Sequence, residues 1–238
     1  MIDIHCHILP GVDDGSKDMK MTKELVKLAK KNGITDFIFT PHMEGGLEAE
    51  HRERVLAAFE ETKKAVKKIL PEAKPCLGCE IMYSESIVDE LSAGKLFTMN
   101  NTDYVLVEFP TYTEFKALKS AVKKIKYAGY TPILAHIERY IGTSKVKYVE
   151  ELSERGALMQ VNCSTVAGEA GLKAKWYVLK LMKLGLVDFV ATDAHRPEWR
   201  KPETAKAFKV IDKKFGREYR DTITVENQMK VMEGLGLE

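Results

Sequence analysis

The chain has 238 residues, 45% of them hydrophobic and 30% charged, which suits one domain spanning residues 1–238 that buries its own core. Its formal net charge of +2 offers little attraction for nucleic acid or an anionic membrane, so neither is expected as a partner. No apolar stretch is long enough to span a bilayer and no secretory leader precedes the first predicted strand, so we expect a cytoplasmic protein without membrane insertion.

Predicted strands and helices alternate along the whole chain. Short apolar runs predict seven strands, at residues 2–5, 36–40, 75–80, 104–109, 131–136, 157–162 and 188–193. Amphipathic periodicity predicts helices at residues 18–32, 48–70, 84–94, 113–128, 146–155, 172–184, 202–215 and 222–234. This alternation is typical of a parallel sheet covered by helices, which is an α/β fold.

Side chains that bind metal ions stand at the ends of six of these seven strands. In chain order they are His5 and His7, His42, Glu80, Glu108, His136, and finally Asp193 with His195. In an open doubly wound sheet, ligands gather at one switch point that two or three strands serve, whereas the strand ends of a barrel form a ring. We therefore predict a seven-stranded (β/α)7 barrel of the TIM type, with these side chains around one site.

The His5-Cys6-His7 segment is the sharpest local feature. Because side chains alternate along a strand, His5 and His7 point to the same face and can hold one cation together. The alternative is a pair of hydrogen-bonded core histidines. The equivalent positions of His42, His136 and His195 favour the metal site.

Glu80 and Glu108 end apolar strands that contain no basic residue. A buried, unpaired carboxylate is normally neutralised by a cation or a proton, so metal ions are the expected partners, and either glutamate can bridge two of them. The loop of residues 11–16 adds Asp13 and Asp14. This loop is expected to be a turn leading to a helix N-cap at Ser16 or Asp18, and Asp14 is a ligand candidate as well.

These nine candidates are too many for one tetrahedral zinc ion and sufficient for two or three ions. They are His5, His7, Asp14, His42, Glu80, Glu108, His136, Asp193 and His195. Mixed imidazole and carboxylate ligation without thiolate suits Mn²⁺, Fe²⁺ or Zn²⁺.

The four cysteines are expected to be packing residues. Cys76 and Cys79 have the spacing of half a zinc knuckle, but no second pair completes it. A cysteine-dependent phosphatase needs an arginine six positions after its nucleophile. The residues at that position after the four cysteines are Val12, Met82, Glu85 and Glu169, so this chemistry is excluded.

Two arginines lie near the cluster in sequence, Arg139 after His136 and Arg200 after His195. Their simplest role is a surface or structural ion pair. A pocket of bound cations has a use for arginine when its ligand is anionic, and arginine binds phosphate oxygens in bidentate fashion. Arg196 is a weaker candidate of the same kind. Together these residues indicate hydrolysis of a phosphate ester.

The opening segment, residues 1–16, resembles that of the polymerase and histidinol phosphatase (PHP) superfamily. Further matching segments are Thr40-Pro41-His42, Gly78-Cys79-Glu80, Val107-Glu108-Phe109, Ala135-His136-Ile137-Glu138-Arg139-Tyr140, Gln160-Val161-Asn162 and Thr192-Asp193-Ala194-His195. Within this superfamily the chain is similar to the manganese-dependent bacterial protein-tyrosine phosphatases encoded with capsule and exopolysaccharide genes.

The resemblance implies a distorted seven-stranded barrel, a trinuclear metal site with the nine ligands above, and phosphotyrosine as substrate. Mn²⁺ is the expected metal, with Fe²⁺, Zn²⁺ or Mg²⁺ as alternatives, and the implied partner is a tyrosine autokinase that regulates polysaccharide export. Arg139 and Arg200 match the phosphate-binding arginines, and Asp14 and Glu108 are expected to act in catalysis. The segment after the last histidine departs from the family pattern, since Arg196-Pro197 competes with Arg200 for this assignment.

The expected enzyme is a metal-dependent phosphoric monoester hydrolase in which a metal-bridging hydroxide attacks the phosphorus of phosphotyrosine. One alternative is a small-molecule phosphatase of the same superfamily, such as histidinol phosphatase. A second is a metal-dependent exonuclease or phosphodiesterase. A third is a scaffold that docks on a kinase and uses metals only for stability.

Overall fold

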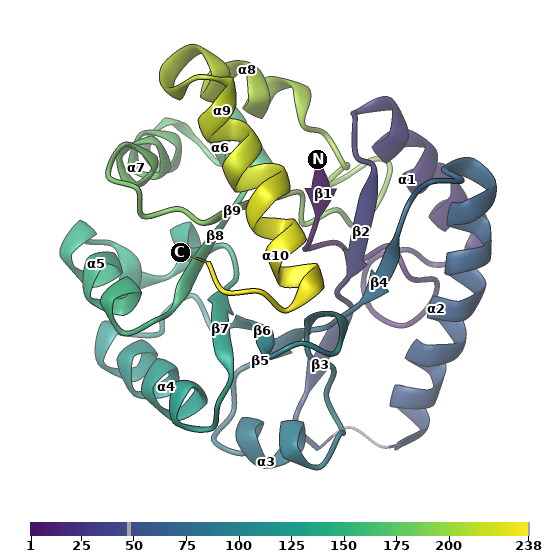
Figure 1. Ribbon diagram of the computed structural model, residues 1–238, viewed down its shortest axis with the longest axis horizontal. Helices are drawn as coiled ribbons and strands as arrows, with labels where there is room; N and C mark the ends of the chain where they lie inside the picture. Colours follow the sequence, from purple (N-terminus) through teal and green to yellow (C-terminus); the bar gives the residue numbers. More distant parts are fainter. Residues whose placement is uncertain (47–48, 238) are drawn as a thin grey trace.

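The computed structural model describes residues 1–46 and 49–237, in which helices surround parallel strands (Figure 1). The strands are β1 (Ile2–Asp3), β2 (Asp36–Phe39), β3 (His42–Glu44), β4 (Pro75–Leu77), β5 (Glu80–Met82), β6 (Tyr104–Glu108), β7 (Thr131–Leu134), β8 (Leu158–Asn162) and β9 (Phe189–Ala191). All seven pairings between them are parallel, so the predicted α/β class is confirmed.

The predicted helices follow the strands in the predicted order, and two further short helices, at residues 163–167 and 217–221, were not predicted. The helices are α1 (Met19–Lys31), α2 (Ala49–Ile69), α3 (Ile87–Ser92), α4 (Phe115–Tyr127), α5 (Val146–Glu154), α6 (Cys163–Ala167), α7 (Leu172–Lys183), α8 (Ala205–Phe215), α9 (Arg217–Asp221) and α10 (Asn227–Glu233). Short 3-10 turns are η1 (Met99–Asn101), η2 (Ile137–Arg139) and η3 (Ile141–Thr143), and η4 (Thr222–Glu226) is a π-helical turn. Residue 48, the predicted start of the second helix, lies outside the described residues.

The strand pairing forms two sheets, with the orders β1-β2-β4 and β3-β5-β6-β7-β8-β9. The prediction of one uninterrupted strand at 75–80 is wrong, because β4 ends at Leu77 and β5 begins at Glu80. A Cβ on Gly78 would lie 2.8 Å from Met99 Sδ, so the chain turns here through a residue without a side chain. Between β2 and β3 the break falls at Pro41, which has no N–H to donate to a ladder.

Single hydrogen bonds span the breaks between the two sheets. Gly78 N donates to Phe39 O at 2.8 Å, and Glu80 N donates to Pro41 O at 3.0 Å. At the far end, an isolated parallel bridge joins Cys6 to Ala194. The strands therefore follow one another around the molecule, but their pairing is not the continuous closed ring that we predicted.

Apolar side chains form two core clusters on opposite sides of the strands. The smaller cluster consists of Ile2, Ile4, Ile38, Met99, Tyr104, Leu106, Ile133, Ala135, Phe189, Ala191 and Val231. Most of its members alternate along their strands with members of the larger cluster, which packs against the surrounding helices. Because both faces of the sheets are buried, the strand sequences are nearly continuous apolar runs.

The C-terminal helical segment lies across the end of the strands where they begin (Figure 1). Tyr104, the first residue of β6, donates from its hydroxyl to Leu235 O at 2.6 Å, and Asn227 donates to Asp188 O at 2.9 Å. The predicted start at residue 222 is wrong, since α9 begins at Arg217 directly after Gly216, whose φ of +90° ends α8. This segment covers one end of the strands and leaves the other end for the polar residues.

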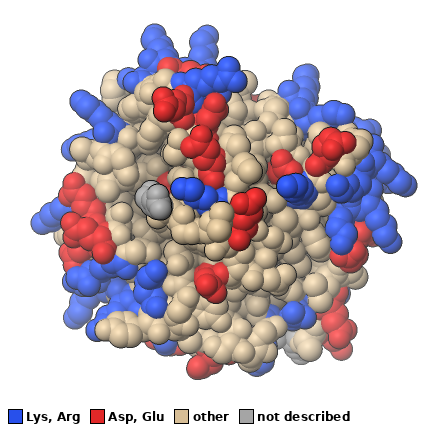
Figure 2. All heavy atoms as spheres, viewed as in Figure 1, with Lys and Arg blue, Asp and Glu red and all other residues tan. Residues whose placement is uncertain are grey.

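Figure 2 shows the face that carries α10, where Lys and Arg lie mainly toward the edges with Asp and Glu between them. Lys and Arg do not form a continuous basic band across this face. Of the helices in residues 1–46 and 49–237, none combines the length and the apolar character needed to cross a membrane.

Candidate metal centre

His5 and His7 follow β1 and direct their rings into the same buried space. Their Nε2 atoms lie 3.3 Å apart, and each lies 3.1 Å from Glu80 Oε2. Both are also 3.7 Å from Asp193 Oδ1. This is the convergence that a His-x-His segment on an extended chain predicts.

Strand register brings Glu80 beside His42. These two residues are partners in the β3–β5 ladder, and His42 Nδ1 lies 3.2 Å from Glu80 Oε2 and 3.1 Å from Glu108 Oε1. Glu80 is 1% exposed, whereas His42 is 36% exposed. Glu80 therefore lies at the centre of the cluster, with His42 at its edge.

His136 completes this side of the site. Its Nε2 lies 2.8 Å from Glu80 Oε1 and 3.5 Å from Glu108 Oε2. His136 has a φ of +32°, in the left-handed region that residues with a side chain rarely adopt. Asp193 at the end of β9 shares this property, with a φ of +54°, so two side chains of the cluster are aimed inward by strained backbone.

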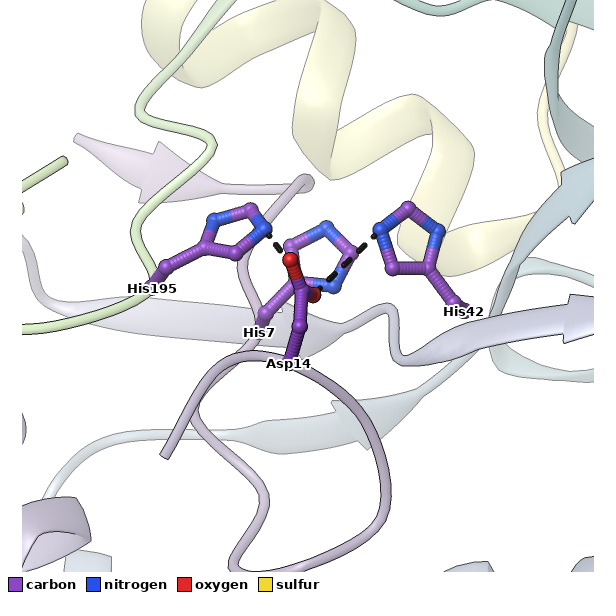
Figure 3. A group of neighbouring side chains, drawn as sticks. All are labelled: His7, Asp14, His42 and His195. Atoms are coloured by element: carbon purple, nitrogen blue, oxygen red, sulfur yellow. Dashed lines mark ion pairs between the residues drawn. The ribbon is translucent and has the colours of Figure 1, made fainter. Parts of the chain in front are cut away.

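Asp14 lies on the loop after β1, between two histidines from distant parts of the chain. Its Oδ1 is 3.4 Å from His195 Nε2 and 3.6 Å from His42 Nε2 (Figure 3). Gly15 allows this loop to approach, since a Cβ there would lie 2.0 Å from His7 O. With 59% of its side chain exposed, Asp14 is the most accessible member of the cluster.

The nine residues predicted from the sequence are thus brought together. They fall into four groups, His7-Asp14-His42-His195, His5-His7-Asp193, His5-Glu80-His136 and His42-Glu80-Glu108, in each of which the potential ligand atoms lie within 4.8 Å of one another. Glu80, His5, His7 and His42 each belong to two groups. Shared members are what a cluster of adjacent cations requires.

The electrostatics of the cluster favour ionised carboxylates next to positive charge. Burial raises the pKa of Glu108, but hydrogen bonds with His136 and His42 outweigh it and lower the pKa to about 2. Burial lowers the pKa of His136, but hydrogen bonds with Glu108 and Glu80 raise it to about 9. For His195, burial and then the charge on His7 lower the pKa to about 4.

The donor chemistry fits bound metal ions. His5 Nδ1 lies 3.0 Å from Gln160 Oε1 and His7 Nδ1 lies 2.8 Å from Asp13 Oδ2. Both partners are acceptors when Asp13 is ionised, so each Nδ1 carries a proton, and the two Nε2 atoms face each other beside a carboxylate oxygen, where they could donate lone pairs to a bound cation. This arrangement of two imidazole nitrogens and a carboxylate oxygen is one that a divalent cation can occupy in place of a proton.

A hollow of about 410 Å³ lies beside the cluster. Asp14, His42 and Glu108 form one part of its wall, and Val12, Met43 and Met82 give it an apolar part. Ligand sites commonly combine an apolar lining with a few convergent polar groups. The cluster is therefore accessible from a space that can take a small organic group.

The arginines occupy different positions. Arg139 donates to Asp193 Oδ2 at 2.8 Å, and Arg200 Nη1 lies 3.5 Å from Asp193 Oδ1 and 3.2 Å from His195 Nε2. Arg196 instead donates to the backbone oxygen of Asp14 at 2.8 and 3.1 Å. Of the two competing residues after β9, Arg200 is the one whose guanidinium reaches the cluster.

Supporting residues around the cluster were not selected from the sequence. Besides Asp13 and Gln160, they include Asn162, whose Nδ2 donates to Asp193 Oδ2 at 2.8 Å, and Tyr140, whose hydroxyl lies 3.3 Å from His136 Nδ1. A signal for two of them was present, because Gln160 and Asn162 stand two apart at a strand end, as His5 and His7 do. Amide side chains at a strand end are a weaker signal than histidine or carboxylates, because they seldom bind these metals directly.

Comparison with known proteins identifies the relatives of this arrangement. Residues 1–233 match the family model for capsular polysaccharide synthesis proteins, CpsB/CapC. The tyrosine-protein phosphatase CpsB of Streptococcus agalactiae serotype V is 29% identical, with 98% of each chain covered. The tyrosine-protein phosphatase YwqE of Bacillus subtilis is 34% identical, with 92% of this chain and 86% of the relative covered.

Comparison with solved structures identifies the same family of proteins. A crystal structure from work on YwqE of Bacillus subtilis and CpsB of Streptococcus pneumoniae, described as metal-dependent tyrosine phosphatases, matches with a TM-score of 0.91 and 31% identity. The match covers 100% of this chain and 96% of that one. The phosphotriesterase of Mycobacterium tuberculosis, at 12% identity and a TM-score of 0.59 over 100% of this chain and 95% of its own, shares the fold alone.

Proposed function

Since the chain belongs to the CpsB/CapC family of capsular polysaccharide synthesis proteins, we propose that it is a metal-dependent protein-tyrosine phosphatase. It hydrolyses the phosphate monoester of phosphotyrosine in a protein. The observation that carries this proposal is the set of four overlapping histidine and carboxylate groups, reached by two arginines. Relatives that match along nearly the whole chain are named for the same activity.

In this proposal the nine clustered residues hold two or three divalent ions. They are His5, His7, Asp14, His42, Glu80, Glu108, His136, Asp193 and His195. Mn²⁺ is our first choice, and Fe²⁺, Zn²⁺ and Mg²⁺ are compatible with parts of the same donor set. Bound ions would supply positive charge for the phosphoryl oxygens and lower the pKa of a water molecule towards neutrality.

The arginines orient the phosphate and balance its charge. The side chains of Arg139 and Arg200 are 31% and 29% exposed, so each can donate to an incoming anion as well as to Asp193. Trp199 holds Arg200 in place, with the guanidinium carbon 4.6 Å from the centre of its ring. The exposed carboxylate of Asp14 and that of Glu108 face the hollow, where they would order water beside the phosphate.

The leaving group needs little help from an acid. A tyrosine phenol has a pKa of about 10, far below that of an aliphatic alcohol, so its oxygen departs more easily as an anion. Val12, Met43 and Met82 line the adjacent hollow and offer an apolar surface to the aromatic ring. These properties favour aryl phosphates as substrates.

Membership of a capsular polysaccharide synthesis family supports a proposal about the cellular context. We propose that the phosphotyrosine protein is a tyrosine autokinase of capsule or exopolysaccharide synthesis and that the phosphatase acts in the cytoplasm.

We also interpret residues 1–238 as one domain and its two sheets as a single distorted seven-stranded barrel, interrupted at residues 40–41 and 78–79.

Phosphatase assays with and without metal test this function. The protein is stripped with a chelator, reloaded with Mn²⁺, and given a phosphotyrosine peptide, histidinol phosphate or labelled single-stranded DNA. We expect hydrolysis of the peptide, its loss on chelation and its return with Mn²⁺. Peptide hydrolysis that survives complete chelation, or a hundredfold preference for histidinol phosphate or DNA, contradicts the proposal.

A further inference from the structure

Strand β8 is the one predicted strand that brings no histidine or carboxylate to the cluster, yet two of its side chains lie at the centre of it. Gln160 and Asn162 alternate inward from this strand and are 0% and 1% exposed. Gln160 Nε2 donates to Asn162 Oδ1 at 2.8 Å, which sets the orientation of both amides.

Gln160 connects two of the candidate ligands. Its Oε1 accepts from the backbone N–H of His136 at 2.7 Å and from His5 Nδ1 at 3.0 Å. The second bond keeps a proton on Nδ1, so that Nε2, which lies toward Glu80 and His7, is the nitrogen that would bind a metal ion. Because Oε1 already accepts two hydrogen bonds, Gln160 serves the cluster without being a ligand.

Asn162 connects a third candidate ligand. Its Nδ2 donates to Asp193 Oδ2 at 2.8 Å, and the same oxygen accepts from Arg139 at 2.8 Å. Arg139 N in turn donates to His136 O at 3.0 Å. Hydrogen bonds therefore form a closed circuit through the ends of β7, β8 and β9, from His136 through Gln160, Asn162, Asp193 and Arg139 back to His136.

This circuit contains both of the strained residues described above. His136 and Asp193 have φ values of +32° and +54°, and such conformations persist only where their surroundings hold them. Gln160 holds the backbone of His136, and Asn162 holds the side chain of Asp193. The pair therefore restrains the backbone of His136 and the carboxylate of Asp193, while the backbone N–H of Asp193 donates to His5 O at 2.8 Å.

We propose that Gln160 and Asn162 are positioning residues that preorganise the metal cluster, an inference that rests on the proposed metal-dependent function. They fix the tautomer of His5, the backbone of His136 and the carboxylate of Asp193 together with Arg139. Loss of a partner that orients a ligand typically lowers metal affinity by about 10- to 100-fold.

The test is Mn²⁺ binding, which does not depend on turnover. The wild type, Gln160→Leu, Gln160→Glu and Asn162→Leu are titrated with Mn²⁺ while the free ion is followed by electron paramagnetic resonance. Gln228→Leu is the matched control, because Gln228 is also 0% exposed but lies in α10, where its Nε2 donates to Ile223 O. Thermal unfolding with a chelator present measures the stability of each variant.

We expect Gln160→Leu and Asn162→Leu to bind Mn²⁺ about 10- to 100-fold more weakly. Gln160→Glu keeps an acceptor for His5 and His136 but loses the donor to Asn162, so it should bind Mn²⁺ more tightly than Gln160→Leu and more weakly than the wild type. Gln228→Leu should bind Mn²⁺ as the wild type does, whatever its stability. If Gln160→Leu does not fold, Asn162→Leu and the recovery in Gln160→Glu carry the test.

Wild-type affinity in both leucine variants, or an equal loss in Gln228→Leu, overturns the inference. A wild-type protein that binds Mn²⁺ but hydrolyses no phosphotyrosine contradicts the proposed function and leaves this inference standing. A wild-type protein that binds no divalent ion at this site contradicts both.

Discussion

Substitution of Gly15 by alanine tests whether the loop after β1 positions the cluster. A Cβ at this position would lie 2.0 Å from His7 O, 2.6 Å from His7 Cβ and 2.9 Å from His7 C. Ordinary contact between such atoms requires roughly 3.5 Å, so the loop must retreat by roughly 1.5 Å. Backbone atoms of a buried segment cannot give way instead.

The retreat displaces two carboxylates at once. Asp13 accepts from Gly15 N at 2.9 Å and from His7 Nδ1 at 2.8 Å, while Asp14 lies 3.4 Å from His195. A misplacement of about 1 Å costs on the order of 100-fold in rate. We therefore expect Gly15→Ala to lower kcat/KM for a phosphotyrosine peptide by about 100-fold and to reduce the Mn²⁺ content.

The assay combines peptide hydrolysis with metal analysis and circular dichroism. Gly236→Ala is the control, because a Cβ there meets nothing within 4 Å. It should be as active as the wild type. A folded Gly15→Ala variant with activity within threefold of the wild type would refute this account of the loop.

Three further predictions concern charge and thiols. Arg200→Lys should raise KM for the peptide by about tenfold through loss of bidentate binding. Arg196→Ala should raise KM less, because Arg196 donates to the backbone oxygen of Asp14. Equal effects of the two substitutions in steady-state kinetics would contradict the assignment of Arg200 as the phosphate-binding arginine. Burial raises the pKa of Asp188 to about 6, so its ionisation lowers the free energy of unfolding as pH rises from below 4 to above 6. When pH is raised from 4.5 to 7.5, the free energy of unfolding of Asp188→Asn should increase by about 1–2 kcal/mol relative to that of the wild type, as measured by urea unfolding of the metal-free protein. A difference that does not change with pH would contradict this. Iodoacetamide should modify only the half-buried Cys76 and leave activity intact, since the other three thiols are buried. If activity falls in proportion to the alkylation measured by mass spectrometry, the exclusion of a cysteine nucleophile is contradicted.

Sequence reasoning located the candidate ligands because the relevant physics is local. Strand ends are marked by the change from apolar to polar residues, and alternation along an extended chain places His5 and His7 on one face. Parallel strands all end at the same edge, so residues as distant as His42 and His195 can be expected to meet. The nine candidates are close together in the structure for these reasons.

The remaining features depend on tertiary contacts that no local pattern carries. The break in the predicted strand 75–80 falls at Gly78, where Met99 leaves no room for a side chain. The left-handed backbone of His136 is held by Gln160 on β8, and that of Asp193 by the backbone oxygen of His5, and both partners are far away in sequence. Likewise, the distinction between Arg196 and Arg200 rests on which side chain turns toward Asp193, and their spacing did not decide it.

Anomalous diffraction from crystals of the Mn²⁺-loaded protein tests the central claim most directly. We predict two or three anomalous peaks, each within coordination distance of at least one of the four groups, with Glu80 contacting more than one of them. A single peak elsewhere in the molecule, or ordered Mn²⁺ that leaves His5, His7 and Glu80 without contact, would contradict the account.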